Sequence, residues 1–462
     1  MKAIIPDFSH KSDKPLYQQL YEYIRDGIIE KEIVTSEKLP SLRNLSESLG
    51  ISLTTVELAY NQLLVEGYIY SRPHSGYYVG EMYWPDDGEA SGTASETGHS
   101  SYLSEMKAPD LYCDPSSFDF NKWKKCMSRV LNDHRDLLLF ESDTQGEESL
   151  RYEISKYVYS SRGVKCTPDQ IVIAAGTQQI TSHLARILQR MGISHVASED
   201  PGYLPVINIF RDRGFTVTPV EVRSDGIDIG KLPVNIRAAA YVNPSNQFPT
   251  GAVMPAGRRY QLIDWAAKNS SFIIEDDYDS ELRYFGKPVP ALQGLDRHGC
   301  VIYLGSFSST LLQSIRLSYM VLPAEMTEVF NEIRADYDQT CSKAEQLTLA
   351  LFMEAGYYRA GIRKLRQLYS KKLKAALDAL RKYPDIAEPI NTESGLNIIV
   401  RVRSEKPMSV LAGEARSVGV VANPMVPVTS GPHGNSLIFY YSLIPLGSIE
   451  KAVGDMVRLW KS

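Results

Sequence analysis

An acidic cluster follows an apolar segment in the second half of the chain. Residues 272–279 read FIIEDDYD, so that Glu275, Asp276, Asp277 and Asp279 come directly after a run that is typical of a buried strand. Four carboxylates in five positions are either the solvated end of a strand or a metal site. No histidine accompanies them, which argues against a metal ion. The sequence therefore predicts no metal site here and leaves the role of the acids open.

Three other polar segments follow apolar runs in the same way. Residues 174–179, AAGTQQ, join a predicted strand to a predicted helix, and small residues at a helix N-terminus can bind an anion, although an ordinary tight turn is the alternative. Tyr203 lies just after the turn EDPG, where a packing role is the usual explanation. Residues 244–251, PSNQFPTG, form a polar loop punctuated by proline. Ligands of open α/β sheets gather at the carboxyl ends of the strands, so these segments are candidates for one site.

The elements that would position these segments alternate along the chain from about residue 118. Apolar runs rich in Ile, Val and Tyr predict strands, and amphipathic stretches between them predict helices. This alternation is typical of an α/β domain with a mainly parallel sheet. The predicted strands lie in the segments QIVIAAG, HVASEDPGY, AAAYVNP, SFIIEDDY, CVIYLGSFS and NIIVRV.

The N-terminal residues have a different pattern. A helix is predicted over residues 15–32, with Leu16, Leu20, Ile24 and Ile28 on one face and Tyr23 beside them. A short helix over residues 42–49 ends at glycine, and a third helix begins after a capping serine and ends before residue 67. Two β-rich runs, YIYSR and GYYV, then flank PHSG. Three helices followed by a small hairpin predict a winged helix-turn-helix.

Between these two parts, residues 81–117 are rich in Gly, Ser, Glu and Asp and predict a flexible linker. We therefore expect a winged helix over residues 1–80, a linker over 81–117 and a larger domain over 118–462. The five cysteines of the 462-residue chain are scattered, which excludes a disulfide framework or zinc site and favours a reducing cytoplasm. No signal peptide or membrane span is expected. The net charge of −5 gives no hint of nucleic-acid binding, and residues 1–80 hold eight basic against ten acidic residues.

The order and spacing of LPSLRNLSESLGIS, followed by AYNQLLVEGYIYSRPHSGYYV, resemble the DNA-binding domain of the GntR family over residues 12–80. The resemblance implies contact with double-stranded DNA through the second helix, the start of the recognition helix and the wing. The residues implied are Ser41, Arg43, Ser52, Thr54, Thr55, Arg72, His74, Ser75 and Gly76. Leu53 and Glu57 depart from the polar and basic residues common in the family. A winged helix that binds protein is the alternative, and we expect useful DNA affinity to need a dimer.

The motifs GTQQ, EDPGY, NPSNQFPTG, EDDYDSELRY, GSFSS and IRLSY, in this order, resemble a fold-type I aminotransferase domain over residues 118–460. A GntR winged helix fused to this domain resembles the MocR subfamily of transcription regulators. The resemblance implies a pocket for pyridoxal 5′-phosphate (PLP), in which Asp276 pairs with the ring nitrogen and Tyr203 stacks on the ring. The residues implied are Gly176, Thr177, Gln178, Tyr203, Asn246, Gln247, Asp276, Tyr278, Ser306, Ser308, Ser309 and Arg316. Asn246 and Gln247 are alternatives for assisting Tyr278.

Ser309 stands where members of the family have the lysine that forms a Schiff base with the cofactor. A hydroxyl cannot form an imine, nor can it move a proton as an amine does in transamination, so the usual catalysis should be absent. Either an engineered substitution or natural loss explains Ser309. Gln313, Ser318 and Phe140 also depart from the family around the same pocket, which favours natural divergence.

We therefore predict a cytoplasmic, homodimeric transcription regulator. Its winged helix binds an operator, and its non-catalytic domain senses a small molecule, either PLP held without a covalent bond or an adduct of PLP with an amino compound. Two alternatives stay open at this point: a working PLP-dependent aminotransferase with an accessory N-terminal domain, and a ligand-free dimerisation scaffold.

Overall fold

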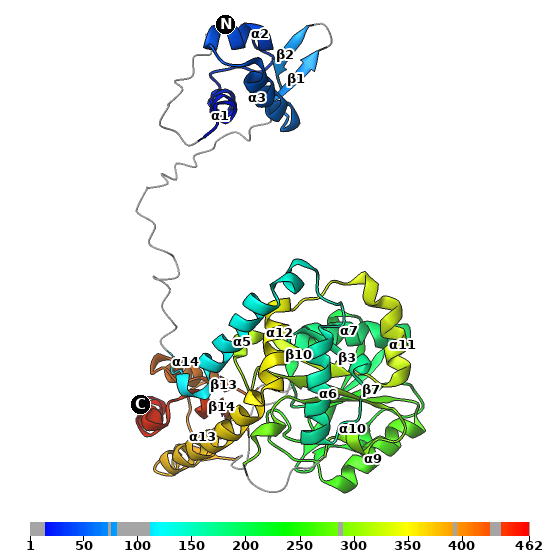
Figure 1. Ribbon diagram of the computed structural model, residues 1–462. Coiled ribbons are helices and arrows are strands. Elements are labelled where there is room, and N and C mark those ends of the chain that lie inside the picture. Colours follow the sequence, from blue (N-terminus) through cyan, green and yellow to red (C-terminus); the bar gives the residue numbers. More distant parts are fainter. Residues whose placement is uncertain are drawn as a thin grey trace. The chain divides into compact units, whose positions relative to one another are not determined.

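The computed structural model describes residues 14–72, 75–80, 111–284, 290–390, 395–425 and 436–461. The chain divides into two compact units, Met1–Met106 and Lys107–Ser462. Figure 1 labels the elements of both units, and each unit is described below by itself.

The first unit is a winged helix. It consists of α1 (Leu16–Ile29), α2 (Leu42–Leu49), α3 (Leu53–Val65), β1 (Ile69–Arg72) and β2 (Gly76–Val79), and the two strands pair antiparallel. The predicted order is confirmed. Leu20, Ile24 and Ile28 are buried as predicted, but Tyr21 rather than Tyr23 joins them in the core. The Tyr21 hydroxyl donates a hydrogen bond to Glu66 at the end of α3, so this tyrosine also ties α1 to α3.

The second unit contains an eight-stranded sheet in the order β3-β10-β9-β8-β7-β4-β5-β6. Strands β9, β8, β7, β4 and β5 are parallel, whereas β10 runs antiparallel between β3 and β9 and β6 runs antiparallel to β5. The predicted α/β class with a mainly parallel sheet is confirmed. The strands are β3 (Ile171–Ala175), β4 (His195–Asp200), β5 (Thr216–Arg223), β6 (Gly226–Ile227), β7 (Ala239–Val242), β8 (Phe272–Asp277), β9 (Val301–Ser306) and β10 (Leu317–Val321).

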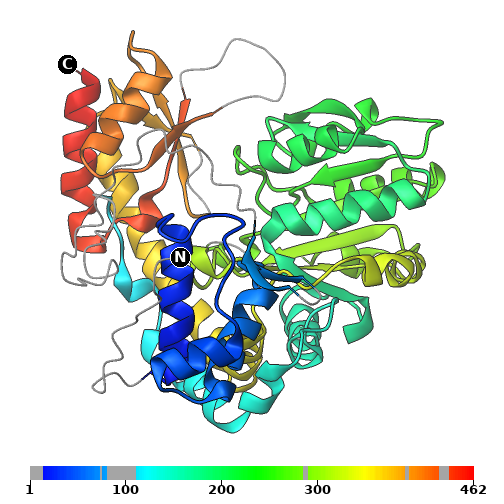
Figure 2. The same cartoon turned by 90° about the horizontal axis from the view of Figure 1, so that it is seen from above.

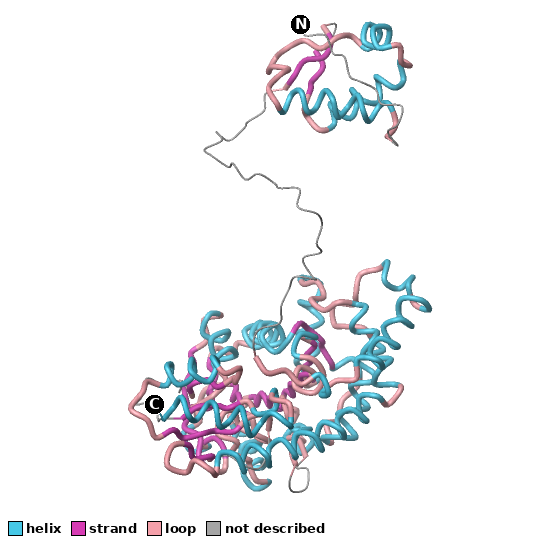
Figure 3. Tube along the Cα trace, turned by 90° about the vertical axis from the view of Figure 1, so that its left-hand side faces the viewer, coloured by secondary structure: helices cyan, strands magenta, loops and turns pink. Residues whose placement is uncertain are grey.

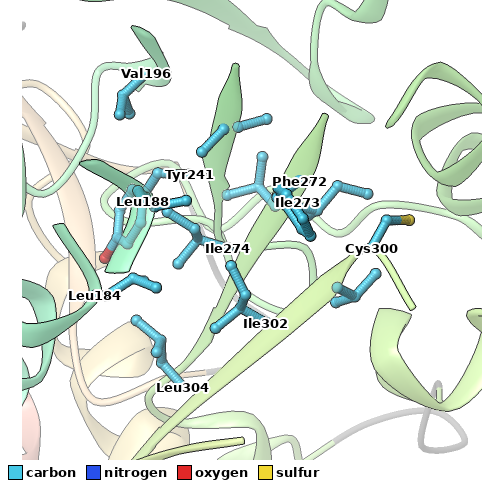
Figure 4. Close-up of a cluster of buried hydrophobic side chains, with 14 of the residues drawn as sticks. Leu184, Leu188, Val196, Tyr241, Phe272, Ile273, Ile274, Cys300, Ile302 and Leu304 are labelled. Carbon is cyan, nitrogen blue, oxygen red and sulfur yellow. The ribbon is translucent and has the colours of Figure 1, made fainter. Parts of the chain in front are cut away.

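Helices cover this sheet, as Figure 3 shows by the magenta strands lying among cyan helices. Leu184 and Leu188 of α7 belong to one buried cluster with Tyr241, Ile274 and Ile302 of the strands (Figure 4). Burial of these apolar side chains fixes the helix on the sheet and so fixes where the helix begins. The helices around the sheet are α5 (Phe120–Asp133), α6 (Glu148–Arg162), α7 (Gly176–Arg190), α8 (Leu204–Asp212), α9 (Ala256–Lys268), α10 (Leu292–Leu295), α11 (Ala324–Ile333) and α12 (Lys343–Glu354).

The C-terminal part of the second unit builds a smaller four-stranded antiparallel sheet in the order β11-β12-β14-β13. In Figure 2 this part, coloured orange to red, lies beside the green part that carries the main sheet. A long helix, α13 (Tyr357–Leu380), leads into it after Gly356, which takes a left-handed conformation with φ 72° and separates α12 from α13. The remaining elements are β11 (Ala387–Pro389), β12 (Ile398–Val402), α14 (Met408–Ser417), β13 (Ala422–Pro424), β14 (Ser436–Phe439) and α15 (Ile449–Lys461).

Part of the range predicted as linker, residues 111–117, belongs to the second unit and packs against its C-terminal part. The backbone N–H of Tyr112 donates to the carbonyl of Gly419 at 2.9 Å, and Asp114 pairs with the buried Lys372 at 2.6 Å. The end of this range is therefore held against the C-terminal part of the chain. Within the described residues, none of the helices combines the length and the apolar character needed to cross a membrane.

Candidate functional site

Asp276 lies at the carboxyl end of the central strand β8 and is buried. The Tyr241 hydroxyl donates a hydrogen bond to its carboxylate, and the Asn243 amide donates to its backbone carbonyl at 2.9 Å. Burial raises the pKa of Asp276 to about 6, and the nearby Asp277 adds to the increase. A cation next to this carboxylate would stabilise its ionised form, so the position suits the protonated nitrogen of a ligand.

The other acids of the cluster have partners of their own. Glu275 accepts hydrogen bonds from the backbone N–H groups of Leu292 and Gln293 at the start of α10, at 2.8 and 3.0 Å. Asp277 pairs with Arg162 at 2.6 Å, and Asp279 accepts from the Asn246 amide at 2.7 Å. Each carboxylate therefore points to a different part of the unit, and the cluster provides one candidate ligand-binding acid rather than a shared metal site.

The start of α7 forms a close contact with Arg316. Gly176 is the first residue of the helix and has φ 82°, and a Cβ atom built there would lie 2.7 Å from the guanidinium Nη2 of Arg316. Glycine adopts this left-handed φ without strain, and its lack of a side chain leaves room for a guanidinium group beside helix N–H groups that also attract anions. Thr177 is half-buried and Gln178 is exposed at the same helix start. Of the residues that the family resemblance implies for the PLP pocket, Gly176 and Arg316 are thus in direct proximity.

Two serines lie beside each other on the neighbouring strands β9 and β10. The hydroxyls of Ser306 on β9 and Ser318 on β10 lie 3.1 Å apart, and the backbone N–H of Ser308 donates to Ser306 at 3.3 Å. Ser318 was predicted only as a departure from the family, yet its hydroxyl contacts a predicted site residue. The antiparallel pairing of β9 and β10 explains this contact, because Ser318 and Ser306 are register partners.

Tyr203 lies near both Asp276 and Arg316. Burial raises the pKa of its hydroxyl, Asp276 raises it further, and Arg316 lowers it, so the phenol is within electrostatic reach of both groups. Its ring meets Phe248 edge to face with 5.9 Å between centroids, and Phe248 meets Tyr278 in the same way at 6.3 Å. These aromatic contacts support a wall of the pocket that spans from the anion-binding end to the acidic end.

The structure distinguishes between Asn246 and Gln247. The Asn246 amide lies 3.4 Å from the Tyr278 hydroxyl. Gln247 instead uses its amide nitrogen for Glu199 and for the backbone carbonyls of Pro201 and Phe248. Gln247 therefore stabilises the loop, and only Asn246 is positioned beside Tyr278.

Ser309 lies in the turn between β9 and β10 and is half-buried. Its hydroxyl makes no hydrogen bond among the described residues. Lys343, the next lysine along the chain, has its amine bonded to the carbonyls of Phe140 and Glu141 at 3.2 and 2.8 Å. Lys287, the preceding lysine, lies outside the described residues. Ser309 is thus next to Ser308 of the predicted site, with no amine of its own loop nearby.

Tyr440 and Asn423 were not among the residues predicted from the sequence. Tyr440 follows β14. Burial raises the pKa of its hydroxyl, and the nearby Tyr203 raises this pKa further, whereas a hydrogen bond with Asn423 lowers it. Tyr440 also affects the pKa of Tyr278, so it lies close to both site tyrosines. The small C-terminal sheet brings it there, and only a polar pair at the end of a strand pattern could have pointed to it in the sequence.

In the winged helix, two predicted DNA-binding serines are N-caps. Ser41 accepts from the backbone N–H of Asn44 at 3.3 Å, and Ser52 accepts from that of Thr55 at 3.1 Å. The hydroxyls of Ser52 and Thr55 also lie 2.8 Å apart. Thr54 stays exposed at the start of α3, as does Arg43 on α2. The caps define where both helices begin, and the exposed side chains remain available to a partner.

The wing holds Arg72 between aromatic rings. Its guanidinium lies 4.8 Å from the Tyr78 ring centroid and donates to the Tyr70 hydroxyl at 2.8 Å. Gly76 is the register partner of Arg72 and has φ 114°, and the Ser75 hydroxyl lies 2.6 Å from that of Tyr78. His74 lies outside the described residues. The hairpin therefore presents a preorganised guanidinium at its tip.

Comparison with known proteins finds a family match in each of the two units. Residues 16–79 match the family described as bacterial regulatory proteins, gntR family, and residues 111–425 match aminotransferase class I and II. The uncharacterized HTH-type transcriptional regulator YdeL of Bacillus subtilis is 38% identical over 99% of both chains. The probable rhizopine catabolism regulatory protein MocR of Rhizobium meliloti is 32% identical over 90% of this chain and 87% of its own. The chain belongs to the MocR-like gntR regulators.

Another relative of this MocR-like regulator is the HTH-type pyridoxine biosynthesis transcriptional regulator PdxR of Corynebacterium glutamicum, 30% identical over 87% of both chains. Among solved structures, the multiple substrate aminotransferase of Thermococcus profundus matches with a TM-score of 0.66 and 23% identity, covering 79% of this chain and 96% of its own. The α-aminoadipate aminotransferase LysN of Thermus thermophilus matches at 0.67 with 24% identity, covering 77% and 91%. These likenesses establish the aminotransferase fold of the MocR-like regulator.

The residues of this regulator fit PLP, the cofactor of the aminotransferase family. Bound PLP supplies an electron-withdrawing ring and a reactive aldehyde. Asp276 would accept a hydrogen bond from the ring nitrogen, and Tyr278 would face the ring oxygen. The contact of Gly176 with Arg316 offers a dianionic phosphate both helix N–H groups and a guanidinium. The close approach of Arg316 to Gly176 at the start of α7 is the observation on which this fit depends.

Proposed function

We propose that this protein is a DNA-binding transcription regulator whose aminotransferase-like domain binds PLP, or its adduct with an amino compound, without a covalent bond and without catalysing transamination. The observation that carries the proposal is the coexistence of Asp276 and the Gly176–Arg316 contact with a serine at position 309. These are the groups that we propose to hold the cofactor, and we propose that Ser309 replaces the amine that would react with it.

The DNA-binding part of the proposal is supported by exposed groups at the start of α3 and by the wing. Thr54 is exposed beside the Ser52 cap, and Arg72 is held at the tip of the hairpin. Glu57 is also exposed on α3, where it would repel phosphate groups. The relatives named as HTH-type transcriptional regulators support the same role. We propose that two winged helices, brought together in a homodimer, bind two operator half-sites.

The proposal that the domain does not catalyse transamination depends on Ser309. A hydroxyl cannot supply the proton transfer that an amine performs at the reacting carbon, so ligand binding has no chemical outcome by the usual route. A reversible ligand instead shifts the population of states that differ in affinity for it. We infer that PLP changes the DNA affinity of the dimer in this way. The protein then acts as a sensor whose readout is operator occupancy.

DNA binding is tested by enriching random-sequence duplexes on the full-length protein and measuring fluorescence anisotropy of the enriched sequence across a KCl series. We expect saturable binding that weakens with salt, and a Glu57→Arg variant whose affinity increases and whose log–log salt slope steepens by about 1. Glu30→Arg, which changes an exposed acid just after α1 by the same charge, is the matched control. Absence of binding at low salt in both wild type and Glu57→Arg would remove the regulator function.

Ligand binding is tested separately by calorimetry with PLP and by an assay for amino-group transfer. We expect a saturable heat, a change in DNA anisotropy when PLP is added, and no transfer from any of the common amino acids to a keto acid. Measurable transfer by the wild-type protein would favour the enzyme, and a missing heat would favour the ligand-free scaffold. Because the DNA and PLP assays are independent, each part of the proposal can fail alone.

A further inference from the structure

A second cavity lies on the side of β8 to which Asp277 points, between α6, the segment after β8 and α13. Its volume is about 300 Å³, at the small end of the range for sites that bind small molecules. Asn246 is the only lining residue that it shares with the predicted PLP residues among the described positions. Five arginines line this cavity, namely Arg162, Arg283, Arg359, Arg363 and Arg366. We call it the arginine cavity.

Three of these arginines form one row on α13. Arg359, Arg363 and Arg366 are spaced by four and three residues, which places them on one face of the helix. Arg359 donates to the Ser160 hydroxyl at 2.8 Å, and Arg366 donates to the backbone carbonyl of Arg283 at 3.0 Å, both neutral acceptors. Among the described residues, no carboxylate lies within ion-pair distance of this row. Within the part of the domain that the structure describes, the positive charge of the row is therefore not neutralised by an ion pair.

Arg162 shows the contrasting arrangement within the same cavity. It is buried and pairs with Asp277 at 2.6 Å. Its charge is compensated inside the domain, as a buried charge requires. The arginines of α13 differ from Arg162 because they are exposed to the cavity and to solvent, where an incoming anion can reach them.

The floor of the cavity also has an unused polar group. The Ser280 hydroxyl oxygen is buried and has no hydrogen-bond partner among the described residues. A buried polar atom without a partner costs free energy that a ligand could recover. Of the acids beside it, Asp279 is buried and Glu281 is half-buried, and desolvation raises the pKa of Glu281 to about 7 and that of Asp279 well above its ordinary value. These two carboxyls therefore offset the arginines less than ionised surface acids would.

We propose that the arginine cavity binds a small polyanion, carrying two or more carboxylate or phosphate groups, at a site separate from the one formed by Asp276 and Arg316. The planar guanidinium fork binds carboxylate and phosphate oxygens in pairs, and three forks in a row match several anionic groups on one molecule. The Ser280 hydroxyl supplies a donor at the floor of the cavity. No group in the cavity is placed to do chemistry, so the site binds its ligand and releases it unchanged.

The shared residue connects the two sites. The Asn246 amide lies 2.7 Å from the Asp279 carboxylate, which lines the arginine cavity, and 3.4 Å from the Tyr278 hydroxyl. A ligand that draws Asn246 or Asp279 toward the cavity changes the hydrogen bonding of Tyr278. By linkage, the polyanion and a ligand beside Tyr278 then alter each other's affinity by the same factor.

The test is calorimetric titration of the full-length protein with citrate, as the carboxylate probe, and with inorganic pyrophosphate, as the phosphate probe. We expect saturable binding of at least one probe. Arg363→Gln should weaken it about tenfold or more, because a charge-assisted contact is lost. Lys371→Gln, which removes an exposed positive charge from the same helix outside the cavity, should leave the affinity unchanged. Arg363 is exposed, so its replacement should leave the melting temperature unaltered.

One further variant, Arg316→Gln, locates the site. Binding that survives in Arg316→Gln and is weakened in Arg363→Gln assigns the probe to the arginine cavity. Binding lost in Arg316→Gln and unchanged in Arg363→Gln would overturn the proposal and assign the anion to the Gly176–Arg316 contact. Absence of saturable binding of both probes would overturn it as well. A decrease in DNA affinity of Arg363→Gln, with the affinity for the probe unchanged, would assign the arginine row to nucleic acid instead.

Discussion

At the scale of single residues, the proposed absence of catalysis depends on Ser309. Its side chain lies in the turn that also carries Ser308, and its hydroxyl has no hydrogen-bond partner among the described residues. Replacing a hydroxyl by an amine at this position should restore a nucleophile where the fold provides for one. The surrounding groups, Asp276 and Arg316, need no change for this.

We therefore predict that Ser309→Lys binds PLP covalently. After incubation with PLP and reduction with borohydride, mass spectrometry should find the added mass on the peptide containing residue 309, and dialysis should no longer remove the ligand. Ser314→Lys, at an exposed position of the same loop, is the control and should stay unlabelled. Reducible attachment of PLP to a lysine of the wild-type protein, accompanied by amino-group transfer, would contradict the role given to Ser309.

Asp276 illustrates how a ligand-binding residue can lower stability. Its carboxyl is buried, and its pKa is raised to about 6 from an ordinary value of 3.8. Between these pH values the folded state binds a proton that the unfolded state has released. Stability therefore falls as the pH rises from about 4 to above 6, and the full cost is present at neutral pH.

Asp276→Asn removes this ionisation without changing the size of the side chain. We expect the free energy of unfolding at neutral pH to increase by roughly 1 to 3 kcal/mol in the absence of ligand. The advantage should disappear near pH 4. PLP affinity should fall about tenfold or more, because the ring nitrogen loses its anionic partner. Urea unfolding at several pH values and PLP calorimetry check these effects, and an unchanged PLP affinity would exclude Asp276 as the partner of the ring nitrogen.

Candidate site residues could be predicted from the sequence where they belong to a short motif beside a strand. A candidate residue that a distant part of the chain brings to the same place could not be predicted. Asp276 lies at the end of β8, Gly176 follows β3, and Arg316 precedes the antiparallel β10, so all three lie at the same edge of the central sheet. Tyr440 comes from the separate C-terminal sheet, and no local pattern indicates that its ring reaches Tyr203. The choice between Asn246 and Gln247 was also out of reach, because it depends on which amide the loop uses for its own hydrogen bonds.

At the scale of elements, capping residues predicted where two helices of the winged helix begin or end. The place of a strand within the sheet depends instead on packing against distant parts of the chain. Ser52 and Gly50 were identified as a cap and a helix end, and both have these roles. By contrast, the helical sequence after residue 343 divides into α12 and α13 at Gly356, which takes a left-handed conformation. Strand β10 was treated as a motif rather than a strand, since its antiparallel place between β3 and β9 depends on residues far away in the sequence.

The N-cap of α3 allows stability and DNA binding to be separated. Ser52→Ala should lower the free energy of unfolding of the winged helix by about 1 kcal/mol, because the backbone N–H of Thr55 loses its acceptor. Ser52→Asp should restore the cap and the helix stability, while its negative charge repels DNA phosphates. Thermal unfolding and DNA anisotropy of the full-length protein measure the two effects. Equal DNA affinity of Ser52→Asp and wild type would show that the start of α3 stays away from the DNA backbone.

At the scale of the whole molecule, an exposed apolar surface in the second unit is a candidate dimer interface. Residues at the end of α5 and in the following turn expose large apolar side chains. These residues are Leu131, Leu137, Leu139 and Phe140, with exposed fractions of 51%, 45%, 82% and 70%. Soluble proteins rarely leave neighbouring apolar side chains so open unless another protein covers them. A symmetric homodimer buries such a surface twice, which fits the proposed need for two winged helices on one operator.

We predict that the variant Leu139→Asp/Phe140→Asp shifts the protein from dimer to monomer in sedimentation velocity, because each aspartate would have to be buried without a partner. DNA affinity should fall at least tenfold with it, since binding through one module loses the effective concentration that the second provides. Tyr159→Asp, at another exposed aromatic position, is the control and should remain dimeric. A fully dimeric double variant would place the dimer interface elsewhere, whereas a monomer with unchanged DNA affinity would show that a single winged helix suffices for binding.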